Sequence, residues 1–528
     1  MMKTTAQPPL ATTGPRPSPG TLVVLIVLAW AALWSVRLAA PPNFVDSDHQ
    51  ERQAAYILDV LVNGHWIHQE SQIGELAGKP PLYTWLAAVA AQTTGGQLTP
   101  FTLYLPGALA TLGVALMLWS WGRRYFGVWP GLLAALAFLF SPAGVRMVNL
   151  ARTDGLFTCT VLAVMLLGFS AWQRGRGWVW FWLAAAAATL TKGPLGLLLG
   201  SLGFLAVFWK DSTPPSPAPD LPSRTSGITR EHLVGAALFL LLCGGWFLLA
   251  WHTWGRPFID RVIFGELLEH AVGSEAGGAT LLKAKPSLAG LAGYYCQPAA
   301  YLFARFLPWS LVGLAGVFRV FRKPAADPAA RRFERFLVCT LLAGLAIFTL
   351  ASHRRPDLLF PLMPALALLA GRELAIWWRP ENRRHALLMP AAAGAAILVL
   401  VLALEHRPAE QQDRNVVRTR GTTLIHQKLA TLYGPDRPPM LYTLDAAVGL
   451  QFLDGTFQRH QPPGDLALRL AAPEPVLVAT GPAGAKKLKA ALPAGTTLYE
   501  VVPWPLPRSS VPAFLTIYSN RPAPGRSP

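Results

Sequence analysis

The sequence predicts an all-α protein that crosses a membrane many times and carries a small α/β domain outside the membrane. Of its 528 residues, 52% are apolar and only 14% are charged, a composition far more apolar than that of an average soluble protein. Apolar runs of about 18–20 residues recur along the chain, and this length crosses the roughly 30 Å of hydrocarbon in a bilayer. After residue 404 the composition changes, because charged residues appear and the apolar runs become short.

The charge and the cysteines exclude two other classes of protein. The formal net charge is +18, but many of the basic residues lie in short loops between apolar runs. The rule that basic loops stay in the cytoplasm explains this placement better than a nucleic-acid-binding groove does. The four cysteines lie mostly within apolar runs and have no metal-ligand spacing, so we expect them to pack as small apolar side chains.

The predicted membrane domain covers residues 21–404 and follows a disordered cytoplasmic tail, residues 1–20. Residues 21–40 form a retained first span, because the run is too long for a signal peptide and Pro41-Pro42 follow it in place of a cleavage site. About 11–13 transmembrane helices are expected in all. The assigned spans are residues 21–40, 102–121, 129–144, 155–172, 178–191, 193–209, 233–252, 301–318, 335–351, 357–376 and 386–404.

The orientation of the chain depends on residues 82–91, a run too short to cross the membrane and therefore predicted to be an interfacial or re-entrant helix. With this choice the basic loops fall on one side, which the positive-inside rule identifies as the cytoplasm. The candidate chemical residues fall on the other side, in a first periplasmic loop at 42–101 and around a later one at 255–300. The N-terminus is then cytoplasmic and residues 405–528 are periplasmic.

Residues 405–528 are predicted to form the α/β domain. Short apolar runs at Pro439–Tyr442, Pro475–Ala479 and Thr497–Val502 indicate strands, and they alternate with the helical stretches Thr422–Tyr433 and Gly484–Leu492. Neither this domain nor the rest of the chain contains a Walker loop, an HExxH or GxSxG motif, or paired CxxC.

The polar segment directly after the first span carries two acids, Asp46 and Asp48, with His49 beside them. A carboxylate there can act as a general base that takes a proton from an acceptor hydroxyl. The structural alternative is an N-cap of the following helix. Asp154, together with Arg152, opens a later span on the same side, and this recurrence favours a functional interpretation over its own alternative as a helix-capping acid.

Cations gather on the same side of the membrane. Lys79 precedes two prolines and the interfacial helix, where it can meet a lipid phosphate or simply extend to the membrane surface; the spacing favours neither. Lys192 occupies a very short break between two apolar runs, a costly place for a charge unless an anion lies nearby. Arg354 and Arg355 lie in SHRRPD at an outer helix end, against the positive-inside trend, and this indicates anion binding.

Six stretches between residues 44 and 371 carry a resemblance to a known family, and they occur in the family's order. They are FVDSDHQERQAAYILDVLVNGHWI, GKPPLYTWLAA, RTDGLFT, LTKGPLGLLL, FLPWSLVG and LLFPLMPALALLAG. With them the chain resembles the integral-membrane glycosyltransferases of the GT-C fold. Within that group it is most similar to bacterial enzymes resembling the lipid A aminoarabinose transferases (ArnT-like) and the dolichyl-phosphate-mannose–protein mannosyltransferases (PMT). The ordered set is specific for the family and says little about the substrate.

The resemblance implies roles for individual residues. Asp48 occupies the place of the family's catalytic base, and Lys79 that of the lysine that touches the carrier-lipid phosphate. Asp154 matches the acid of the family's Arg-x-Asp step and is a catalytic candidate that would help orient the acceptor. Lys192 matches the Thr-Lys-Gly-Pro lysine, and Arg355 fits the basic residue before the Leu-Pro helix.

Glu266 and His270 approximate a Glu…Arg pattern in a later outer loop of the family, where they are candidate acceptor or loop contacts. The chain departs from the family at His49, where relatives usually have Glu. One extra residue also lies before Trp66, and this leaves Asp46 as a rival to Asp48 for the base.

The resemblance therefore implies transfer of a sugar, with inversion, from a polyprenyl-phosphate donor to a lipid, glycan or protein acceptor at the periplasmic face of a bacterial inner membrane. No nucleotide sugar or nucleic acid is implied, and a divalent metal near Asp46, Asp48 and His49 is left open. The alternative is a flippase or transporter for the same lipid-linked sugar. Such a protein should show inverted repeats and ionisable residues near the bilayer midplane, and the sequence shows neither.

Overall fold

The computed structural model describes most of the 528-residue chain. The described residues are 18–39, 50–209, 229–268, 288–351, 354–377, 394–395, 397–398, 414–506 and 512–524. The predicted site residues Asp46, Asp48, His49 and His270 lie outside them, as do most of the predicted cytoplasmic tail and most of the predicted span at 386–404.

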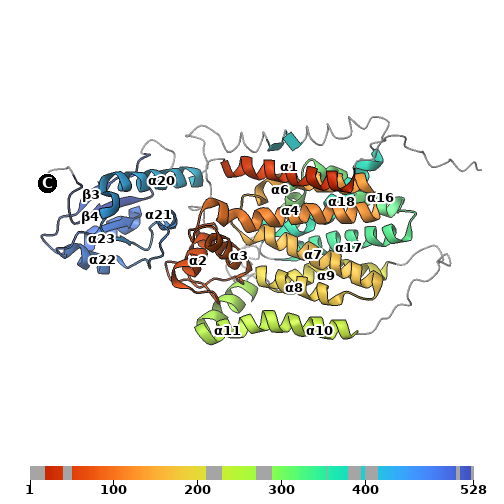
Figure 1. Cartoon of the computed structure of the whole chain (residues 1–528), viewed down its shortest axis with the longest axis horizontal. Coiled ribbons are helices and arrows are strands. Elements are labelled where there is room, and N and C mark those ends of the chain that lie inside the picture. Colours follow the sequence, from red (N-terminus) through yellow and green to blue (C-terminus); the bar gives the residue numbers. More distant parts are fainter. Residues whose placement is uncertain are drawn as a thin grey trace, which may run out of the picture.

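The first three quarters of the described chain are helical (Figure 1). In chain order the helices are α1 (Pro19–Ala39), α2 (Gln50–Asn63), α3 (Leu82–Thr93), α4 (Pro100–Tyr125), α5 (Val128–Leu139), α6 (Pro142–Met147), α7 (Thr153–Arg174), α8 (Trp178–Lys192), α9 (Leu195–Ser201), η1 (Leu202–Phe208), α10 (Arg230–Phe239), η2 (Leu240–Gly244), α11 (Gly245–Trp254), α12 (Arg256–Ile259), η3 (Asp260–Leu268), α15 (Leu288–Arg305), α16 (Trp309–Arg322), α17 (Pro328–Leu350), η4 (Pro356–Leu362) and α18 (Met363–Trp377).

Six helical segments of the described residues are long and apolar enough to cross a membrane, and the bent pair α15–α16 raises this number to seven if it forms one span. The six are α1, α4, α7, α17, the run from α10 through η2 to α11, and the run from η4 to α18. The predicted all-helical multi-pass membrane fold is confirmed. Of the eleven assigned spans, those at α5, α8 and the α9–η1 pair are shorter than a full crossing, the span at 301–318 falls on the bent pair α15–α16, and the span at 386–404 lies mostly outside the described residues.

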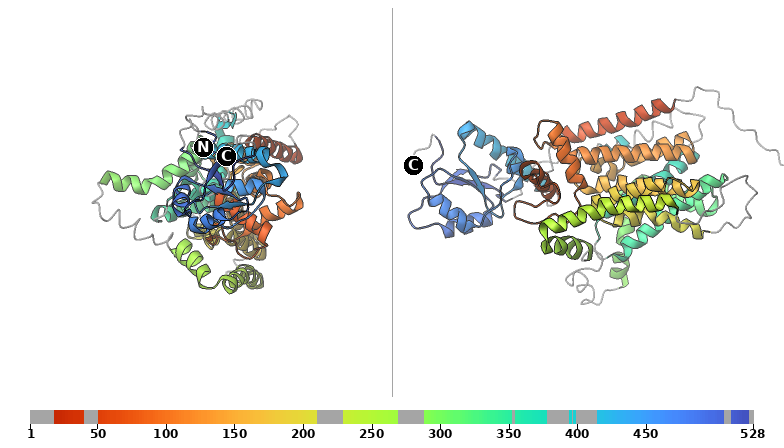
Figure 2. Two further views of the ribbon diagram at one scale, coloured as in Figure 1. Left: turned by 90° about the vertical axis from the view of Figure 1, so that its left-hand side faces the viewer. Right: turned by 60° about the horizontal axis from the view of Figure 1, so that its bottom comes forward.

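The long helices run side by side along the length of the molecule (Figures 1 and 2). The centre of this bundle is built by α4, α5 and α18, with α7 and α8 packed beside α4. Glycines allow the backbones to approach closely: a Cβ at Gly131 of α5 would lie 2.5 Å from the carbonyl oxygen of Trp119 in α4, and one at Gly371 of α18 would lie 2.4 Å from that of Pro130. Small residues at such contacts are a common means of packing helices within membranes.

The helices are interrupted or bent at two places. Helix α8 ends at Lys192 because Gly193 adopts a left-handed φ of 87°, and Pro194 then begins the next helix. Helices α15 and α16 meet at an angle of 113° around residues 306–308. The predicted interfacial run 82–91 is the helix α3, which has only 12 residues and packs against α2 and α4.

The C-terminal part is a separate α/β layer at one end of the bundle (Figure 1). Its elements are α20 (Arg414–Tyr433), η7 (Gly434–Asp436), β1 (Met440–Tyr442), α21 (Val448–Asp454), α22 (Pro463–Ala471), β2 (Leu477–Thr480), α23 (Pro482–Ala491), β3 (Tyr499–Val502) and β4 (Thr516–Ser519). The strand order is β1-β2-β4-β3, with β1 and β2 parallel and the other pairs antiparallel. The three predicted strands coincide with β1, β2 and β3; the sequence prediction missed β4.

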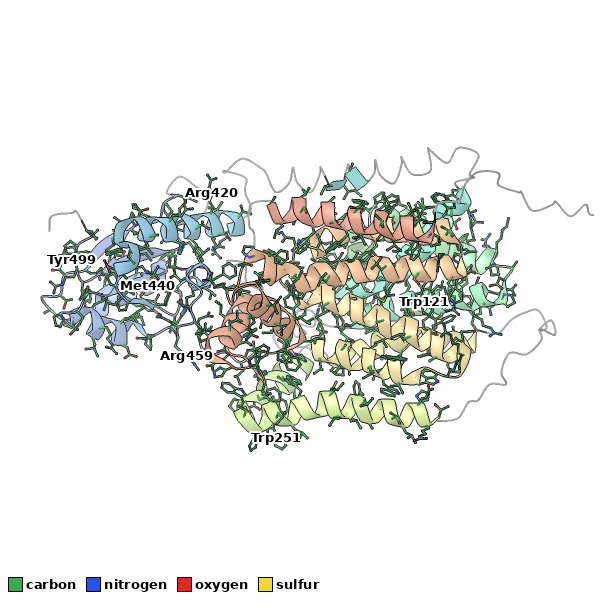
Figure 3. All side chains as sticks on the ribbon, in the orientation of Figure 1. Trp121, Trp251, Arg420, Met440, Arg459 and Tyr499 are labelled. Carbon is green, nitrogen blue, oxygen red and sulfur yellow. The ribbon has the colours of Figure 1, made fainter. Side chains whose placement is uncertain are left out.

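The α/β domain docks onto the segment between α1 and α3. Phe452 of α21 is buried in a cluster with Ala54 and Leu58 of α2 and Tyr83 of α3. The backbone N–H of His460 donates to the carbonyl oxygen of Gln72 at 2.9 Å, and Arg459 forms an ion pair with Glu70. Figure 3 shows Arg459 on the side of the domain that faces this segment.

Candidate functional site

One large cavity combines charged and apolar walls and has a volume of about 670 Å³. One wall is apolar and comes mainly from α9, α11 and α17; it includes Leu198, Phe247 and Phe348. The lining also includes charged residues from segments far apart in the sequence: Lys79, Arg152, Lys192, Glu266, Arg355 and Asp357. An elongated apolar ligand with a charged head matches this division.

A smaller, mostly polar cavity of about 70 Å³ lies next to it. The two cavities share Gly78, Lys79, Pro80, Arg152 and Glu266 in their walls. The other residues that line the small cavity are Arg52, Gln53, Tyr56, Ala77, Thr84, Thr153 and Arg261. Lys79 and Arg152 therefore stand at the boundary between an apolar chamber and a polar one.

Charges of alternating sign form a continuous chain across the site. Lys192 Nζ lies 2.5 Å from Asp154 Oδ1, and Arg152 Nη2 lies 3.1 Å from Asp154 Oδ2. Arg152 Nη1 then reaches Asp357 Oδ2 at 2.6 Å, and Arg355 Nη2 lies 3.7 Å from the same oxygen. Asp154 is almost fully buried, with 2% of its side chain exposed, so its charge depends on these two cations.

Local structure explains why these side chains converge. Asp154 is the second residue of α7, Lys192 is the last of α8, and α7 packs against α8. Arg355 directly precedes η4, which also packs against α7. The chain therefore places three charged helix ends at one end of the bundle, where an acid at a helix start and a lysine at a helix end also suit the helix dipoles.

Lys79 lies in the loop before α3 and is only partly exposed. The backbone N–H of Ala77 donates to the carbonyl oxygen of Gln69 at 2.8 Å, which fixes the loop. Gly78 lies very close to Glu266 of η3, because a Cβ at Gly78 would lie 2.4 Å from Glu266 Oε1. Burial is the main cause that lowers the pKa of Lys79 from 10.5 to about 8, and neighbouring Lys192 lowers it further.

The structure separates the two predicted arginines of SHRRPD. Arg355 lines the large cavity. Arg354 instead donates to three backbone carbonyl oxygens, those of Tyr294, Thr349 and Ala351, and its guanidinium lies over the ring of Tyr294. These contacts join the end of α17 to α15, and each nitrogen of the Arg354 guanidinium donates to a backbone carbonyl oxygen.

The described residues contain one group of side chains that could hold a metal, and the segment named from the sequence, Asp46, Asp48 and His49, lies outside them. Among the described residues, the ligand atoms of Asp59, His65 and Glu70 lie within 4.8 Å of one another. Each has a protein partner: Asp59 accepts from His65 Nδ1 at 3.0 Å and from the N–H of Glu70 at 2.9 Å, and Glu70 pairs with Arg459. These bonds organise the loop after α2, and we assign the cluster this structural role.

Sequence reasoning missed several residues of the site. Asp357 contacts both Arg152 and Arg355. Its position in the first turn of η4 is the same kind of signal that pointed to Asp154 at the start of α7. Arg52, Tyr56 and Arg261 carried no signal, because each lies in an ordinary amphipathic or loop segment and is brought to the cavity only by folding. Glu266, which the sequence did suggest, lines both cavities.

The geometry suits the recognition of a phosphate on an apolar chain. Four cations line the large cavity, whereas two carboxylates line it and a third, Asp154, lies just behind. Because the carboxylates already engage Arg152 and Lys192, an entering anion meets cations that are fixed in place, and fixed cations stabilise a developing negative charge effectively.

Comparisons with known proteins agree with this geometry. The family model described as "Dolichyl-phosphate-mannose-protein mannosyltransferase" matches residues 78–216. The "Undecaprenyl phosphate-alpha-4-amino-4-deoxy-L-arabinose arabinosyl transferase 1" of Pseudomonas fluorescens (strain Pf0-1) is 26% identical over 358 residues, which are 62% of this chain and 57% of that protein. The chain thus matches less than two thirds of this relative's length.

Solved structures show the fold. ArnT from Cupriavidus metallidurans bound to undecaprenyl phosphate has a TM-score of 0.69 at 18% identity, over 96% of this chain and 99% of that one. Its apo state has a TM-score of 0.68 at 17% identity, over 95% and 98% of the two chains. The mycobacterial arabinofuranosyltransferase AftD (mutant R1389S, class 1) has a TM-score of 0.50 at 14% identity, over 95% of this chain and 41% of AftD.

Proposed function

We propose that this chain, a GT-C-fold membrane protein similar to the ArnT-like and PMT glycosyltransferases, transfers a sugar from a polyprenyl-phosphate carrier to an acceptor at the periplasmic face of a bacterial inner membrane. The observation that carries the proposal is the large cavity, whose apolar wall leads to the cations Lys79, Arg152, Lys192 and Arg355. The matching arabinosyl transferase is named for an undecaprenyl-phosphate donor, which has this shape and charge.

In the proposed reaction the phosphate of the donor binds between Lys79, Lys192 and Arg355, with its polyprenyl chain along the apolar wall. The acceptor hydroxyl attacks the anomeric carbon from the face opposite the phosphate, which inverts its configuration. A carbon–oxygen bond to the acceptor forms as the bond to the phosphate oxygen breaks, and the hydroxyl proton passes to Asp48 or Asp46. The cations stabilise the phosphate as it leaves with its added negative charge.

The small polar cavity is where we place the reacting groups, because it adjoins Lys79 and Arg152 and is lined by polar side chains. Asp154 is held by Lys192 and Arg152 at 2.5 and 3.1 Å. We assign it the role of orienting these two cations, while a carboxylate of the loop before α2 acts as the base.

The proposal is tested with the purified full-length protein in lipid nanodiscs, given a labelled undecaprenyl-phosphate-linked aminoarabinose or mannose and a bacterial glycolipid extract. We expect release of undecaprenyl phosphate that depends on the extract and falls at least about tenfold in Lys79→Met, since a contact to a charged group is worth roughly 1.5–3 kcal/mol. Lys323→Met, an exposed lysine of the loop after α16, is the matched control. Equal release by wild type and Lys79→Met would contradict the phosphate assignment.

The same assay distinguishes Asp48 from Asp46 as the catalytic base, and it distinguishes sugar transfer from flipping of the lipid-linked sugar. Asp48→Asn and Asp46→Asn are compared, and the base is the residue whose loss lowers the rate with little change in donor KM. A flippase would move the labelled donor between leaflets of a vesicle without releasing undecaprenyl phosphate. Translocation without release in the presence of acceptor would therefore replace our proposal by that alternative.

A further inference from the structure

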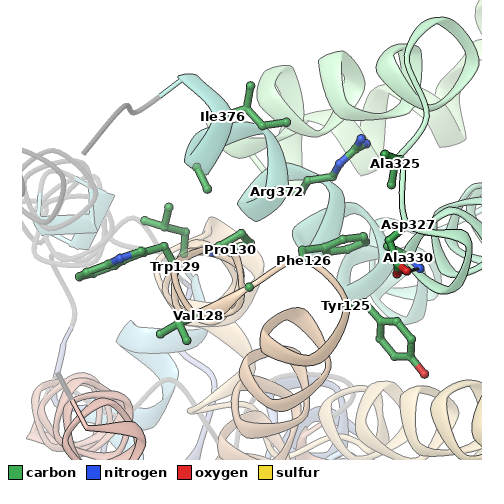
Figure 4. A pocket seen from close by; sticks show the side chains of 14 residues that line it. Tyr125, Phe126, Val128, Trp129, Pro130, Ala325, Asp327, Ala330, Arg372 and Ile376 are labelled. Atoms are coloured by element: carbon green, nitrogen blue, oxygen red, sulfur yellow. Dashed lines mark hydrogen bonds between the residues drawn. The ribbon is translucent and has the colours of Figure 1, made fainter. Parts of the chain in front are cut away.

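The charged residues of a second large cavity, at the opposite end of the bundle, are engaged within the protein. This cavity has a volume of about 570 Å³, and its charged lining residues are Asp327 and Arg372 (Figure 4). Asp327 accepts from the N–H of Ala330 at 2.8 Å and caps α17, and Arg372 Nη2 pairs with Glu334 at 2.9 Å. The small polar cavity of the candidate site differs, because two polar side chains of α2 line it without such partners.

These two side chains are Arg52 and Tyr56. Both belong to α2 and line the small cavity, and their spacing of four residues places them one turn apart on the same face of the helix. Arg52 is exposed and Tyr56 is partly exposed, so a ligand in the cavity can reach both. Neither side chain forms a hydrogen bond or an ion pair with another residue that the structure describes.

Helix α2 holds the two side chains in a fixed position. Ile57 and Leu58 of this helix are buried in one cluster with Tyr83 of α3. Gln53 Nε2 of α2 also donates to Thr84 Oγ1 of α3 at 2.8 Å. The two free polar groups therefore lie on a rigid element, which is what the recognition of a ligand requires.

Tyr56 is a hydrogen-bond donor in this position. Burial is the main cause that raises its pKa to about 12, although nearby Arg261 and Arg52 oppose the shift, so the phenol keeps its proton at neutral pH. Arg261 is itself occupied, since its Nε donates to the carbonyl oxygen of Leu76 at 3.2 Å and its Nη2 lies 3.8 Å from Glu75. A polar group that loses water without gaining a partner is destabilising, and a ligand oxygen would supply that partner to Tyr56.

The position of the cavity indicates which part of the ligand it meets. The small cavity shares Lys79 and Glu266 with the large one, and in the proposed reaction Lys79 holds the donor phosphate. The sugar is bonded directly to that phosphate, so it is the part of the donor that reaches the small cavity. Sugar hydroxyls both donate and accept hydrogen bonds, which suits the Tyr56 hydroxyl as a donor and the Glu266 carboxylate as an acceptor.

We propose that Tyr56 contacts the transferred sugar, with its hydroxyl donating a hydrogen bond to a hydroxyl oxygen of the ring. Arg52, one turn earlier on α2, contacts the same edge of the sugar. This inference rests on the proposed function and adds to it. Lys79, Lys192 and Arg355 recognise the phosphate that every donor carries, whereas the two α2 residues distinguish one sugar from another. A few well-placed polar groups are enough to orient a ligand and select it.

The test compares two lipids that differ only in the sugar, both bound to the full-length protein in nanodiscs. One is undecaprenyl phosphate and the other is its mannose or aminoarabinose derivative, whichever the wild type binds more tightly. Tyr56→Phe removes only the hydroxyl. We expect it to raise Kd for the sugar-bearing lipid about fivefold, the size expected for one lost hydrogen bond, and Kd for undecaprenyl phosphate by less than about twofold.

Tyr433→Phe is the matched control. Tyr433 is a partly exposed tyrosine at the end of α20 and lines neither cavity, so Kd for both lipids should stay as in the wild type. Arg52→Gln is a second variant, and it should weaken binding of the sugar-bearing lipid more than binding of undecaprenyl phosphate. The melting temperature of each variant should equal that of the wild type, which shows that the variants are folded.

Two outcomes would overturn the inference. Equal changes in Kd for the two lipids in Tyr56→Phe, including no change in either, would show that the hydroxyl does not contact the sugar. An unchanged donor Kd with a raised acceptor KM would place Tyr56 at the acceptor instead. Failure of the proposed function is a separate result, because it appears as a wild type that releases no undecaprenyl phosphate. The sugar contact is measured by binding and needs no turnover.

Discussion

At the scale of single residues, the site depends on how one lysine is buried. Lys79 lies at the boundary of the two cavities, where burial lowers its pKa to about 8. The unfolded chain would hold this proton up to about pH 10.5. Protonated Lys79 therefore costs stability below about pH 8, and the fold gains stability as the pH rises from about 8 to 10.5. The proposed phosphate binding would have the opposite dependence, because it needs the protonated lysine.

We therefore predict that kcat/KM for the lipid-linked donor falls as the pH rises through about 8. In Lys79→Arg the guanidinium stays charged throughout this range, so the alkaline fall should disappear or move upward by more than one pH unit even if the overall rate is lower. The measurement is a pH profile of kcat/KM for both proteins between about pH 6.5 and 9.5. The same fall in both proteins would show that another group titrates.

A second prediction concerns Asp357, which holds Arg152 at 2.6 Å. Asp357→Asn removes the charge that fixes Arg152 and Arg355, and we expect kcat/KM to fall about tenfold, which corresponds to about 1.4 kcal/mol. The matched control is Asp260→Asn, which removes an exposed carboxylate paired with Arg256 and should change activity by less than about twofold. A fall of equal size in both variants would argue against a specific role for Asp357.

At the residue scale, the sequence pointed to charges that the structure brings together where the surroundings of a charge were already unusual. Lys192 was recognisable because it sits between two apolar runs, and Arg152 and Asp154 because they open a span. Asp357 was not, since its partner Arg152 lies 205 residues away. Nor could the sequence distinguish Arg354 from Arg355, because the direction of each side chain depends on how α17, α15 and η4 meet.

At the scale of elements, helix α3 decides the orientation of the whole chain. It has 12 residues, which reach about 18 Å at 1.5 Å per residue, too short for the hydrocarbon core. It also rests on α2 and α4, as an interfacial helix of the loop would. If it does not cross, Gln97 lies on the outer side with the site, and Lys323 lies on the cytoplasmic side.

We predict this result for single cysteines introduced at Gln97 and Lys323, both of which are exposed. In a protein whose four natural cysteines are replaced by alanine, Gln97→Cys should react with a membrane-impermeant maleimide in intact cells. Lys323→Cys should react only after the membrane is permeabilised. Labelling of both positions in intact cells would contradict the assigned orientation. Labelling of Lys323→Cys alone would indicate the opposite orientation.

Elements were predicted well where hydropathy alone specifies them. Each span predicted between residues 21 and 376 overlaps one helix or two to three consecutive helices. The breaks were less visible: η2 lies within one apolar run, and the 113° bend between α15 and α16 depends on packing. Strand β4 has only four residues, TIYS, too few for a recognisable strand pattern. Its strand conformation is stabilised by pairing with β2 and β3, which the sequence does not reveal.

At the scale of the whole molecule, the α/β domain is part of the structure that holds the outer loop. Phe452 is 3% exposed and shares a core with α2 and α3, and the N–H of Val448 donates to Glu51 at the start of α2. Since Asp46 and Asp48 directly precede α2, the domain supports the segment that carries the proposed base.

We predict that Phe452→Ala lowers stability by about 3–5 kcal/mol at this contact and reduces sugar transfer. The α/β domain itself should remain folded, because its sheet has a core of its own. Limited proteolysis should then release the α/β domain faster than in wild type. Leu468→Ala, an exposed leucine of the same domain, is the control. Normal activity in Phe452→Ala with an undocked domain would show that docking serves stability alone.

The alternating chain from Lys192 to Arg355 has a consequence for turnover. The carboxylates of Asp154 and Asp357 already pair with Lys192 and Arg152. In the proposed reaction, a donor phosphate would compete with these carboxylates, and so would the carrier phosphate that remains after the sugar has been transferred. When that product leaves, the carboxylates would pair with the cations again. Competition of this kind would limit how tightly the product is held, and would favour exchange of used carrier for new donor.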